Sequence, residues 1–478
     1  MRKVQQHKIL ALIETLKEAQ ASGLYGDCQE CALQVGSYID RLEGDDTKTV
    51  SLLENYYELL YRVSIGETDG QSLQKLLLEI ENSVKTELKP NKFKALFLPY
   101  YDNTWETMKS VYLAFASSPL FETEVVIIPI LRNTNVGVTN IWEDYLTPAG
   151  IQNTHYDAYS FEDDLPDIVF FNQPYDGVNI PKFQSHNIRK YTEKMVYIPY
   201  GIVPINVQGK TYEDNYVKLD PIQRCNLYIA QSEPFREFYL KGNPLYRNTL
   251  PVGNPKQDCL YAAKAHGDFT HYPDWEAAIG NRRVIMLNTH YSSMLDDVET
   301  HPGIKRLIDN IARNDNLFLI WRPHPTAFIM KMSAMMTELL DFAQSHERML
   351  VDRTPSILPA YIYSNAVVSL FPSSIIMDAL FLDLPVFLLG RESSSSSSRS
   401  IPFYSALTHE NYEISPKDDI DRAVFEPLDA FLEDVASGKD SMREARSLYR
   451  MSEFPNQDGS VASNILEYIK GILGGGKS

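Results

Sequence analysis

The chain has 478 residues, of which 44% are hydrophobic and 23% charged, so its length suits about three globular domains. Its formal net charge is -18, from 45 basic and 63 acidic residues, which argues against broad nucleic-acid binding because that function needs a basic face. No apolar run approaches the roughly 20 residues that span a bilayer, and the first residues lack the apolar run of a signal peptide. We therefore expect a cytoplasmic protein, either free or peripheral at the inner face of the cell membrane.

Residues 1–88 are expected to be helical, because apolar residues recur there at helical spacing in four segments separated by polar breaks that contain glycine. We interpret this region as a cap or an oligomerisation unit without chemistry of its own. Cys28 and Cys31 form a CxxC inside it, but no second CxxC completes a zinc site. Two cysteines on one helix face are the favoured interpretation, and we predict neither a metal ion nor a cofactor.

The pattern changes at Lys89, where short apolar runs begin to alternate with helical stretches, as in parallel sheets with crossover helices. Two such series predict an α/β fold with two doubly wound domains that face a cleft, over residues 89–265 and 266–478, with Ser460–Ile472 as a closing helix. The predicted strands are Ala95–Leu98, Thr123–Pro129, Ile168–Phe171, Lys194–Ile198, Leu227–Ala230 and Thr249–Val252 in the first series, and Val284–Leu287, Leu317–Trp321, Met349–Val351, Ala366–Leu370 and Val386–Leu389 in the second.

The first motif that indicates chemistry is Arg322-Pro323-His324-Pro325, which follows the buried run Leu317–Trp321. Two prolines stiffen the turn at the carboxyl end of this strand, where ligands of open parallel sheets bind. Arg322 supplies a cation for phosphate oxygens, and His324 can donate to a phosphate or move a proton near neutral pH. A rigid loop with a solvated histidine is the alternative interpretation.

The second motif is the turn Pro372-Ser373-Ser374, which joins the strand Ala366–Leu370 to a helix expected over Ser374–Leu382. Ser373 or Ser374 is a natural N-cap. Free backbone N–H groups and the positive end of the helix dipole also make a helix start a site for anions. Capping alone is the favoured interpretation for an isolated helix, but two such motifs in one sheet favour a phosphate site.

These two motifs carry a resemblance. Arg322-Pro323-His324-Pro325 and the later run from Ser373 to Leu380 resemble the CDP-glycerol glycerophosphotransferase family, which includes the teichoic acid polymerases of Gram-positive bacteria, and Gly253-Asn254-Pro255-Lys256-Gln257-Asp258 is similar to the family's Gly-x-Pro-Arg-x-Asp. The resemblance covers about Asn91 to Ile472. It implies a GT-B fold and the transfer of a phospho-alditol unit from a CDP-alditol, without a required metal.

The resemblance also implies roles for particular residues. The histidine that matches His324 is functionally essential in the family, and the Ser373-Ser374 turn binds donor phosphate there. We assign Arg322, Asp378 and His290, which follows the strand Val284–Leu287, to the same donor site. For His290, two interpretations are open: a role in proton transfer, or a position in a solvent-facing loop without a functional role.

The chain departs from the family pattern at two positions. Phe371-Pro372 stands where the family has Asp-Tyr before the Ser-Ser pair, and Tyr200 stands where it has the histidine of a Trp-His-Gly-like motif. A phenol with a pKa near 10 is a poor base at pH 7. If Tyr200 replaces the family base, another residue must take the proton of the acceptor, or none does.

Candidates for the acceptor side lie in the first domain. Asp102 follows the strand Ala95–Leu98 and Asp176 follows Ile168–Phe171, so either carboxylate is a candidate to accept a proton from an alcohol. Turn capping is the favoured interpretation for both, and Asp102 is the first choice if one of them is the base. The other acceptor-side candidates are Trp105, Asn172 and Tyr175.

We therefore predict a CDP-glycerol- or CDP-ribitol-dependent phosphotransferase in cell-surface polymer or polysaccharide synthesis. Its partners are a nucleotide-activated alditol or sugar as donor and a glycan or polyol-phosphate, lipid-linked or free, as acceptor. A GT-B glycosyltransferase that uses a nucleotide sugar and a non-catalytic nucleotide-binding or scaffold protein are the alternatives. The run Ser393–Ser398 is interpreted as a linker, with a lid over the cleft as the second choice.

Overall fold

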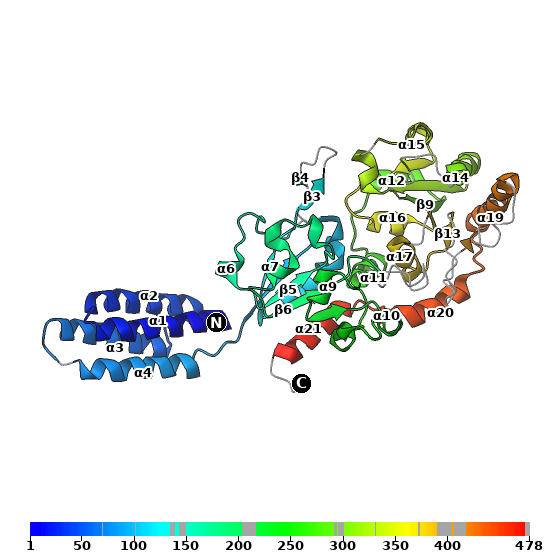
Figure 1. Cartoon of the computed structure of the whole chain (residues 1–478). Coiled ribbons are helices and arrows are strands. Elements are labelled where there is room, and N and C mark those ends of the chain that lie inside the picture. Colours follow the sequence, from blue (N-terminus) through cyan, green and yellow to red (C-terminus); the bar gives the residue numbers. More distant parts are fainter. Residues whose placement is uncertain are drawn as a thin grey trace.

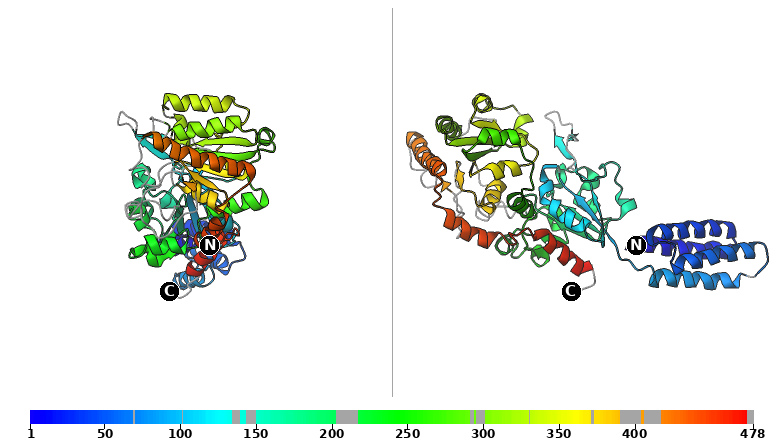
Figure 2. Two further views of the ribbon diagram at one scale, coloured as in Figure 1. Left: turned by 90° about the vertical axis from the view of Figure 1, so that its right-hand side faces the viewer. Right: turned by 180° about the vertical axis from the view of Figure 1, so that it is seen from behind.

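The computed structural model describes residues 1–68, 70–100, 102–133, 139–142, 150–202, 217–290, 294, 301–329, 331–370, 373–389, 404–405 and 417–473. It contains an N-terminal helical bundle followed by two α/β domains (Figure 1), which confirms the predicted fold class. The bundle lies beside the first α/β domain, at the end of the molecule far from the second (Figure 2). Among the described helices, none is both long and apolar enough to cross a membrane.

The N-terminal bundle has a core of its own. Its helices pack their apolar faces on one another, so that Ile13, Tyr56 and Leu77 are fully buried. Thr47 caps the third helix by accepting a hydrogen bond from the backbone N–H of Val50. The four predicted helical segments are present, as α1 (Lys3–Ala21), α2 (Tyr25–Glu43), α3 (Lys48–Ser64) and α4 (Gln71–Thr86).

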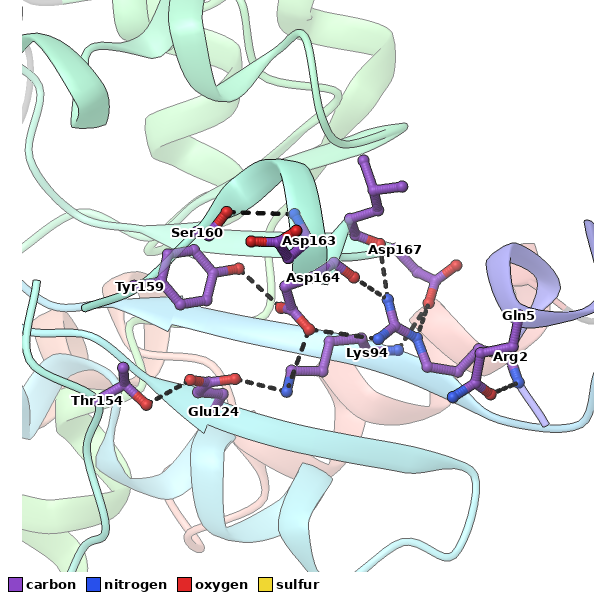
Figure 3. A network of polar contacts seen from close by, with 11 residues as sticks. Arg2, Gln5, Lys94, Glu124, Thr154, Tyr159, Ser160, Asp163, Asp164 and Asp167 are labelled. Atoms are coloured by element: carbon purple, nitrogen blue, oxygen red, sulfur yellow. Dashed lines mark hydrogen bonds and ion pairs between the residues drawn. The ribbon is translucent and has the colours of Figure 1, made fainter. Parts of the chain in front are cut away.

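Arg2 joins this bundle to the first α/β domain (Figure 3). Its guanidinium donates to the backbone oxygens of Asp164 and Leu165 over 2.6 and 2.7 Å, and lies 3.6 Å from the carboxylate of Asp167. Lys94, on the first strand of the domain, pairs with Asp164 as well, over 3.5 Å. The acidic turn around Asp164 therefore binds one cation from the bundle and one from the sheet.

The first α/β domain is built on a parallel sheet of strand order β2-β1-β5-β6-β7-β8. Its strands are β1 (Phe93–Leu98), β2 (Phe121–Val125), β5 (Ile168–Phe171), β6 (Lys194–Tyr197), β7 (Leu227–Ile229) and β8 (Thr249–Leu250). Each was predicted, although β2 begins and ends earlier than expected. The antiparallel pair of β3 (Ile130–Asn133) and β4 (Thr139–Trp142) was not predicted. The helical segments are η1 (Asp102–Thr107), α5 (Lys109–Ala116), α6 (Phe161–Asp164), η2 (Asp176–Val178), η3 (Pro181–Phe183), α7 (Ser185–Ile188), α9 (Asp220–Gln223), α10 (Glu233–Tyr239) and η4 (Pro244–Asn248).

The second α/β domain has the parallel strand order β11-β10-β9-β12-β13-β14. The order reverses between β9 and β12, and ligands of open α/β sheets bind at the carboxyl ends of the strands at such a reversal. Its strands are β9 (Arg283–Thr289), β10 (Leu317–Pro323), β11 (Met349–Val351), β12 (Ala366–Ser369), β13 (Val386–Leu388) and β14 (Tyr404–Ser405). Its helical segments are α12 (Pro273–Ile279), α14 (His301–Arg313), η5 (Pro325–Ile329), α15 (Ala334–Ser345), α16 (Leu358–Tyr363), α17 (Ser374–Phe381), α19 (Lys417–Ser437) and α20 (Arg443–Glu453).

Two helices cross between the domains. The first, α11 (Lys256–His266), follows the first sheet in sequence but packs Leu260 in the core of the second domain. The second, α21 (Val461–Leu473), packs Ile465 against the first sheet and α5. The expected boundary at 265–266 stays a prediction; α11 packs on the second domain, and the predicted closing helix, α21, packs on the first.

Candidate functional site

Three neighbouring strands of the second sheet bring the predicted donor residues to one edge. Pro323 of β10 pairs with Thr289 of β9, and Ser369 of β12 pairs with Asn288 of β9. The chain therefore leaves all three strands at the same level, directly before His324 and His290, and shortly before Ser373. This edge lies at the reversal of strand order, where the motifs were expected to meet.

His324 is held by the backbone of the neighbouring strand. Its N–H donates to the carbonyl oxygen of Thr289 over 2.9 Å. The hydroxyl of Thr289 in turn accepts a hydrogen bond from the indole of the fully buried Trp321, over 3.1 Å. The half-buried ring of His324 lies 5.7 Å from the ring of His290, measured between centroids. The strand ends therefore place two imidazoles side by side.

Both imidazoles are uncharged at neutral pH. Burial lowers the pKa of His324 to about 4, and the neighbouring His290 contributes to this decrease. Desolvation also lowers the pKa of His290. A neutral imidazole offers one N–H donor and one acceptor nitrogen, so the pair presents hydrogen-bonding groups rather than fixed positive charge.

The start of α17 carries no side-chain cap among the described residues. Ser373 occupies the N-cap position with an extended backbone, but its hydroxyl accepts no hydrogen bond from the helix. That hydroxyl oxygen is buried and has no hydrogen-bond partner in the described part of the chain. Ser373 thus occupies the predicted N-cap position, but its buried hydroxyl makes no capping hydrogen bond, which leaves the first backbone N–H groups of α17 without a side-chain cap from the described residues.

The first domain reaches this helix start. A Cβ atom at Gly201, which follows β6, would lie 3.0 Å from Cβ and 3.3 Å from Oγ of Ser374. An added methyl group would be tighter there than ordinary van der Waals packing, so the backbone of Gly201 passes close to the side chain of Ser374. Tyr200, which precedes Gly201 directly, is 37% exposed. The site therefore has elements of both domains.

The guanidinium of Arg322 is bonded to residues of the 352–355 loop. Nη1 lies 2.5 Å from the carboxylate of Asp352, which has no exposed side-chain surface, and 3.1 Å from Oγ1 of Thr354. Nη2 donates to the backbone oxygens of Thr354 and Pro355 over 3.0 and 3.4 Å. In this structure Arg322 fixes the 352–355 loop, and its predicted contact with donor phosphate stays a prediction.

Asp378 differs from its predicted role. Its side chain is fully buried inside the second domain, where it pairs with Lys256 over 2.5 Å and accepts a hydrogen bond from Tyr361 over 3.0 Å. An enclosed carboxylate cannot contact a donor directly. The residue types at the strand and helix ends indicated the site, but the partners of Asp378 lie on distant segments that the sequence pattern did not identify.

Three of the predicted acceptor-side residues have structural partners. The fully buried amide of Asn172 accepts from the backbone N–H of Tyr100 and donates to the hydroxyls of Thr104 and Thr107. Asp176 accepts from the backbone N–H and the hydroxyl of Ser185 at the start of α7, which is the capping role that was favoured. Trp105 is 7% exposed and packs in the core beside α5.

Two further acceptor-side predictions are not decided. Tyr175 is 41% exposed, and Asp102 begins η1, although its side chain lies outside the described residues. Phe371, Pro372 and the run Ser393–Ser398 lie outside them as well.

A contact that the sequence did not indicate is the hydrogen bond from the hydroxyl of Ser356, in the second domain, to the carboxylate of Glu106 on η1. Within the described residues no group of three or more His, Cys, Asp or Glu side chains is placed to hold a metal ion.

Comparison with known proteins supports the fold. No protein-family model matches the sequence, and no curated protein matches it. A UDP-N-acetylglucosamine 2-epimerase structure aligns over 80% of this chain and 97% of its own, with 12% identity and a TM-score of 0.54. A putative UDP-N-acetylglucosamine 2-epimerase from Listeria monocytogenes aligns over 80% and 97%, with 14% identity and a TM-score of 0.52. The wall teichoic acid polymerase TagF aligns over 88% and 99%, with 10% identity and a TM-score of 0.44, too low to support a conclusion. The chain thus has the GT-B fold.

Proposed function

We propose that this chain is a GT-B transferase that binds a CDP-alditol at the carboxyl edge of its second sheet and transfers the phospho-alditol unit to an acceptor hydroxyl. The observation that supports this most is the convergence of three features at the reversal of strand order: His324, His290 and the uncapped start of α17. A helix start with unsatisfied N–H groups suits a diphosphate. The resemblance of the same segments to glycerophosphotransferase motifs supplies the donor class.

The proposed reaction is a substitution at phosphorus. The acceptor oxygen attacks the phosphorus that bears the alditol, the bond from that phosphorus to the bridging oxygen breaks, and CMP leaves with the bonding electrons. The acceptor proton passes to a base, for which Asp102 is the first candidate. Positioning and electrostatic stabilisation of the phosphate oxygens supply most of the rate in such reactions.

His324 meets the donor as a neutral hydrogen-bond donor in this proposal. Its lowered pKa in the free protein means that no imidazolium is present at pH 7 before the donor binds. A bound diphosphate would raise the pKa of His324, because a nearby negative charge favours the protonated ring. Gain of a proton on donor binding would then strengthen the contact as charge develops on the phosphate oxygens.

A thermal-unfolding screen tests the donor class. Ligands that bind only the folded protein raise its unfolding temperature, and at a concentration one hundredfold above Kd the stabilisation is about 2.7 kcal/mol. We expect CDP-glycerol, CDP-ribitol and CDP to stabilise the protein more than UDP-N-acetylglucosamine or UDP. An equal or larger effect of UDP-N-acetylglucosamine would favour a nucleotide-sugar enzyme instead.

A charge variant locates the binding site in the same screen. Ser373→Glu places a carboxylate at the start of α17 and should abolish the effect of CDP compounds. Ser463→Glu adds the same charge to the exposed first turn of α21, which packs against the first sheet, and should leave the effect intact. Stabilisation by CDP in both variants would show that the ligand binds elsewhere.

A further inference from the structure

A buried ion pair lies beneath the start of α17. The carboxylate of Asp378, one helical turn after Ser374, accepts a hydrogen bond from Lys256 over 2.5 Å and from the hydroxyl of Tyr361 over 3.0 Å. Both contacts involve Oδ2, whereas the buried Oδ1 has no hydrogen-bond partner among the described residues. The hydroxyl of Tyr361 also lies 3.3 Å from the carbonyl oxygen of Ile375. Burial raises the pKa of Asp378, and the Lys256 ammonium acts to lower it, so the negative charge of Asp378 depends on Lys256.

Lys256 also connects α17 to the first domain. Its backbone N–H donates to Oδ1 of Asn254 over 3.0 Å, and Nδ2 of Asn254 donates to the carbonyl oxygen of Pro199 over 2.7 Å. Pro199 lies two residues before Gly201, which contacts Ser374. Two routes thus join the 199–201 segment of the first domain to α17, one through this contact and one through the ion pair.

The charge of this pair matters to an anion at the helix start. Asp378 lies about 6 Å along the helix axis from Ser374, at 1.5 Å per residue. Water and salt screen a charge at that depth only weakly, so an uncompensated carboxylate would repel a bound phosphate. Burial acts to lower the pKa of Lys256, but the carboxylates of Asp378 and Glu106 outweigh it and raise the pKa above its ordinary value. Lys256 is therefore a stable ammonium ion.

We infer that Lys256 is a positioning residue of the donor site, which neutralises Asp378 beneath the start of α17 and ties that helix to the 199–201 segment. The inference rests on the proposed anion site at this helix start. A buried ion pair that served stability alone would be replaceable by apolar residues of similar volume. A pair that sets the charge beneath an anion is not replaceable in this way without a change in anion affinity.

Isothermal titration with inorganic pyrophosphate and with CDP, on the full chain at pH 8.5, tests this role; the high pH favours an ionised Asp378 when Lys256 is replaced, since burial raises the pKa of this carboxyl. Lys256→Met leaves the carboxylate unpaired and should weaken pyrophosphate binding by about tenfold. Asp378→Asn leaves the ammonium unpaired and should tighten it. Lys256→Arg keeps the charge and should bind pyrophosphate within about twofold of wild type. Lys305→Met, which removes a cation from an exposed helix pair with Asp309, should leave binding unchanged.

The double variant Lys256→Met/Asp378→Leu covers the case in which a single variant fails to fold. It removes both buried charges, so its unfolding temperature should return towards that of wild type, while its pyrophosphate affinity should fall between those of the two single variants. Circular dichroism confirms folding for each protein.

The pattern of affinities decides the inference. Opposite effects of Lys256→Met and Asp378→Asn support it, whereas equal weakening by both folded variants, or no change in either, would overturn it. If wild type binds pyrophosphate but not CDP, the nucleotide assignment fails while the role of Lys256 is still decided by the pyrophosphate series. If wild type binds neither pyrophosphate nor CDP, both the proposed anion site and the role of Lys256 are wrong.

Discussion

The imidazole rings of His290 and His324 lie 5.7 Å apart at the ends of the adjacent parallel strands β9 and β10. Neither ring belongs to the apolar core, and the backbone of the neighbouring strand fixes His324 through Thr289. Two neutral imidazoles at the reversal of strand order, with the start of α17 on the neighbouring strand connection, are the groups at which we propose that a phosphate-bearing ligand binds.

We expect His324→Ala to lower the rate of CMP release by about 10²-fold or more, because it removes a hydrogen-bond donor aimed at charge on the phosphate. The fold should survive, with a loss of about 1 kcal/mol at most for a half-buried loop residue. Initial rates and urea unfolding measure the two effects. His271→Ala, at an exposed histidine of the second domain, serves as the control. A rate close to wild type in His324→Ala would remove His324 from the mechanism.

The lowered pKa of His324 also predicts a change in stability with pH. The folded state disfavours the protonated ring, with a pKa of about 4 against about 6.5 when unfolded. The unfolded chain therefore binds more protons in this range, and the stabilising effect present above pH 6.5 is lost as the pH falls towards 4. Between pH 7 and 4.5 the free energy of unfolding should fall by about 2 kcal/mol more in wild type than in His324→Asn. Parallel pH curves for the two proteins would contradict the lowered pKa.

Much of the fold follows from the sequence because it rests on local patterns. The buried strands β10 and β12 contain the continuous apolar runs 317–321 and 366–368, and turn residues mark the bundle helices. The short pair of β3 and β4 gives no such pattern. The placement of α21 on the first domain could not be predicted, since an amphipathic helix shows which face is buried but not what covers it.

The strand ends and the helix start that form the proposed site were predicted from the sequence, but several of the contacts around them were not. Arg322 lies near the end of β10 and Asp378 lies one turn into α17, yet Asp352 and Lys256 bind them from segments that are distant in sequence. Residue types at strand ends indicate where a ligand edge lies. They do not indicate which polar side chains form ion pairs inside the protein instead of facing a ligand, because that depends on the three-dimensional packing.

Gly201→Ala should weaken CDP binding by about tenfold or less and leave stability nearly unchanged. The added methyl would lie 3.0 Å from Cβ of Ser374, so the 199–201 segment and the start of α17 must separate by a few tenths of an ångström, and such small displacements at a site are costly to binding and rate. Gly177→Ala adds a methyl where nothing lies within 4 Å and provides the control. Equal CDP affinity in both variants would show that the contact with Ser374 does not shape the site.

Arg322→Met should lower the free energy of unfolding by about 3–5 kcal/mol, because it leaves the buried carboxylate of Asp352 without its counter-charge. The comparison is Arg306→Met, which breaks a more exposed pair with Asp429 and should cost only about 1 kcal/mol. Urea unfolding at pH 7 measures both. If Arg322→Met is as stable as Arg306→Met but fails to bind CDP, then Arg322 acts on the donor rather than on the 352–355 loop.

Phosphorus-31 NMR of the protein incubated with CDP-glycerol tests the central claim most directly, because the products identify the bond that breaks. Transfer or slow hydrolysis at phosphorus yields CMP together with a glycerol phosphate or its ester, and we expect these products, with their formation strongly reduced in His324→Ala. Release of CDP would contradict transfer of the phospho-alditol unit, because both phosphates then stay with the nucleotide and only the glycerol unit leaves. Binding of CDP-glycerol without any product, across a panel of glycan and polyol-phosphate acceptors, would contradict the proposed activity and favour a non-catalytic nucleotide-binding protein.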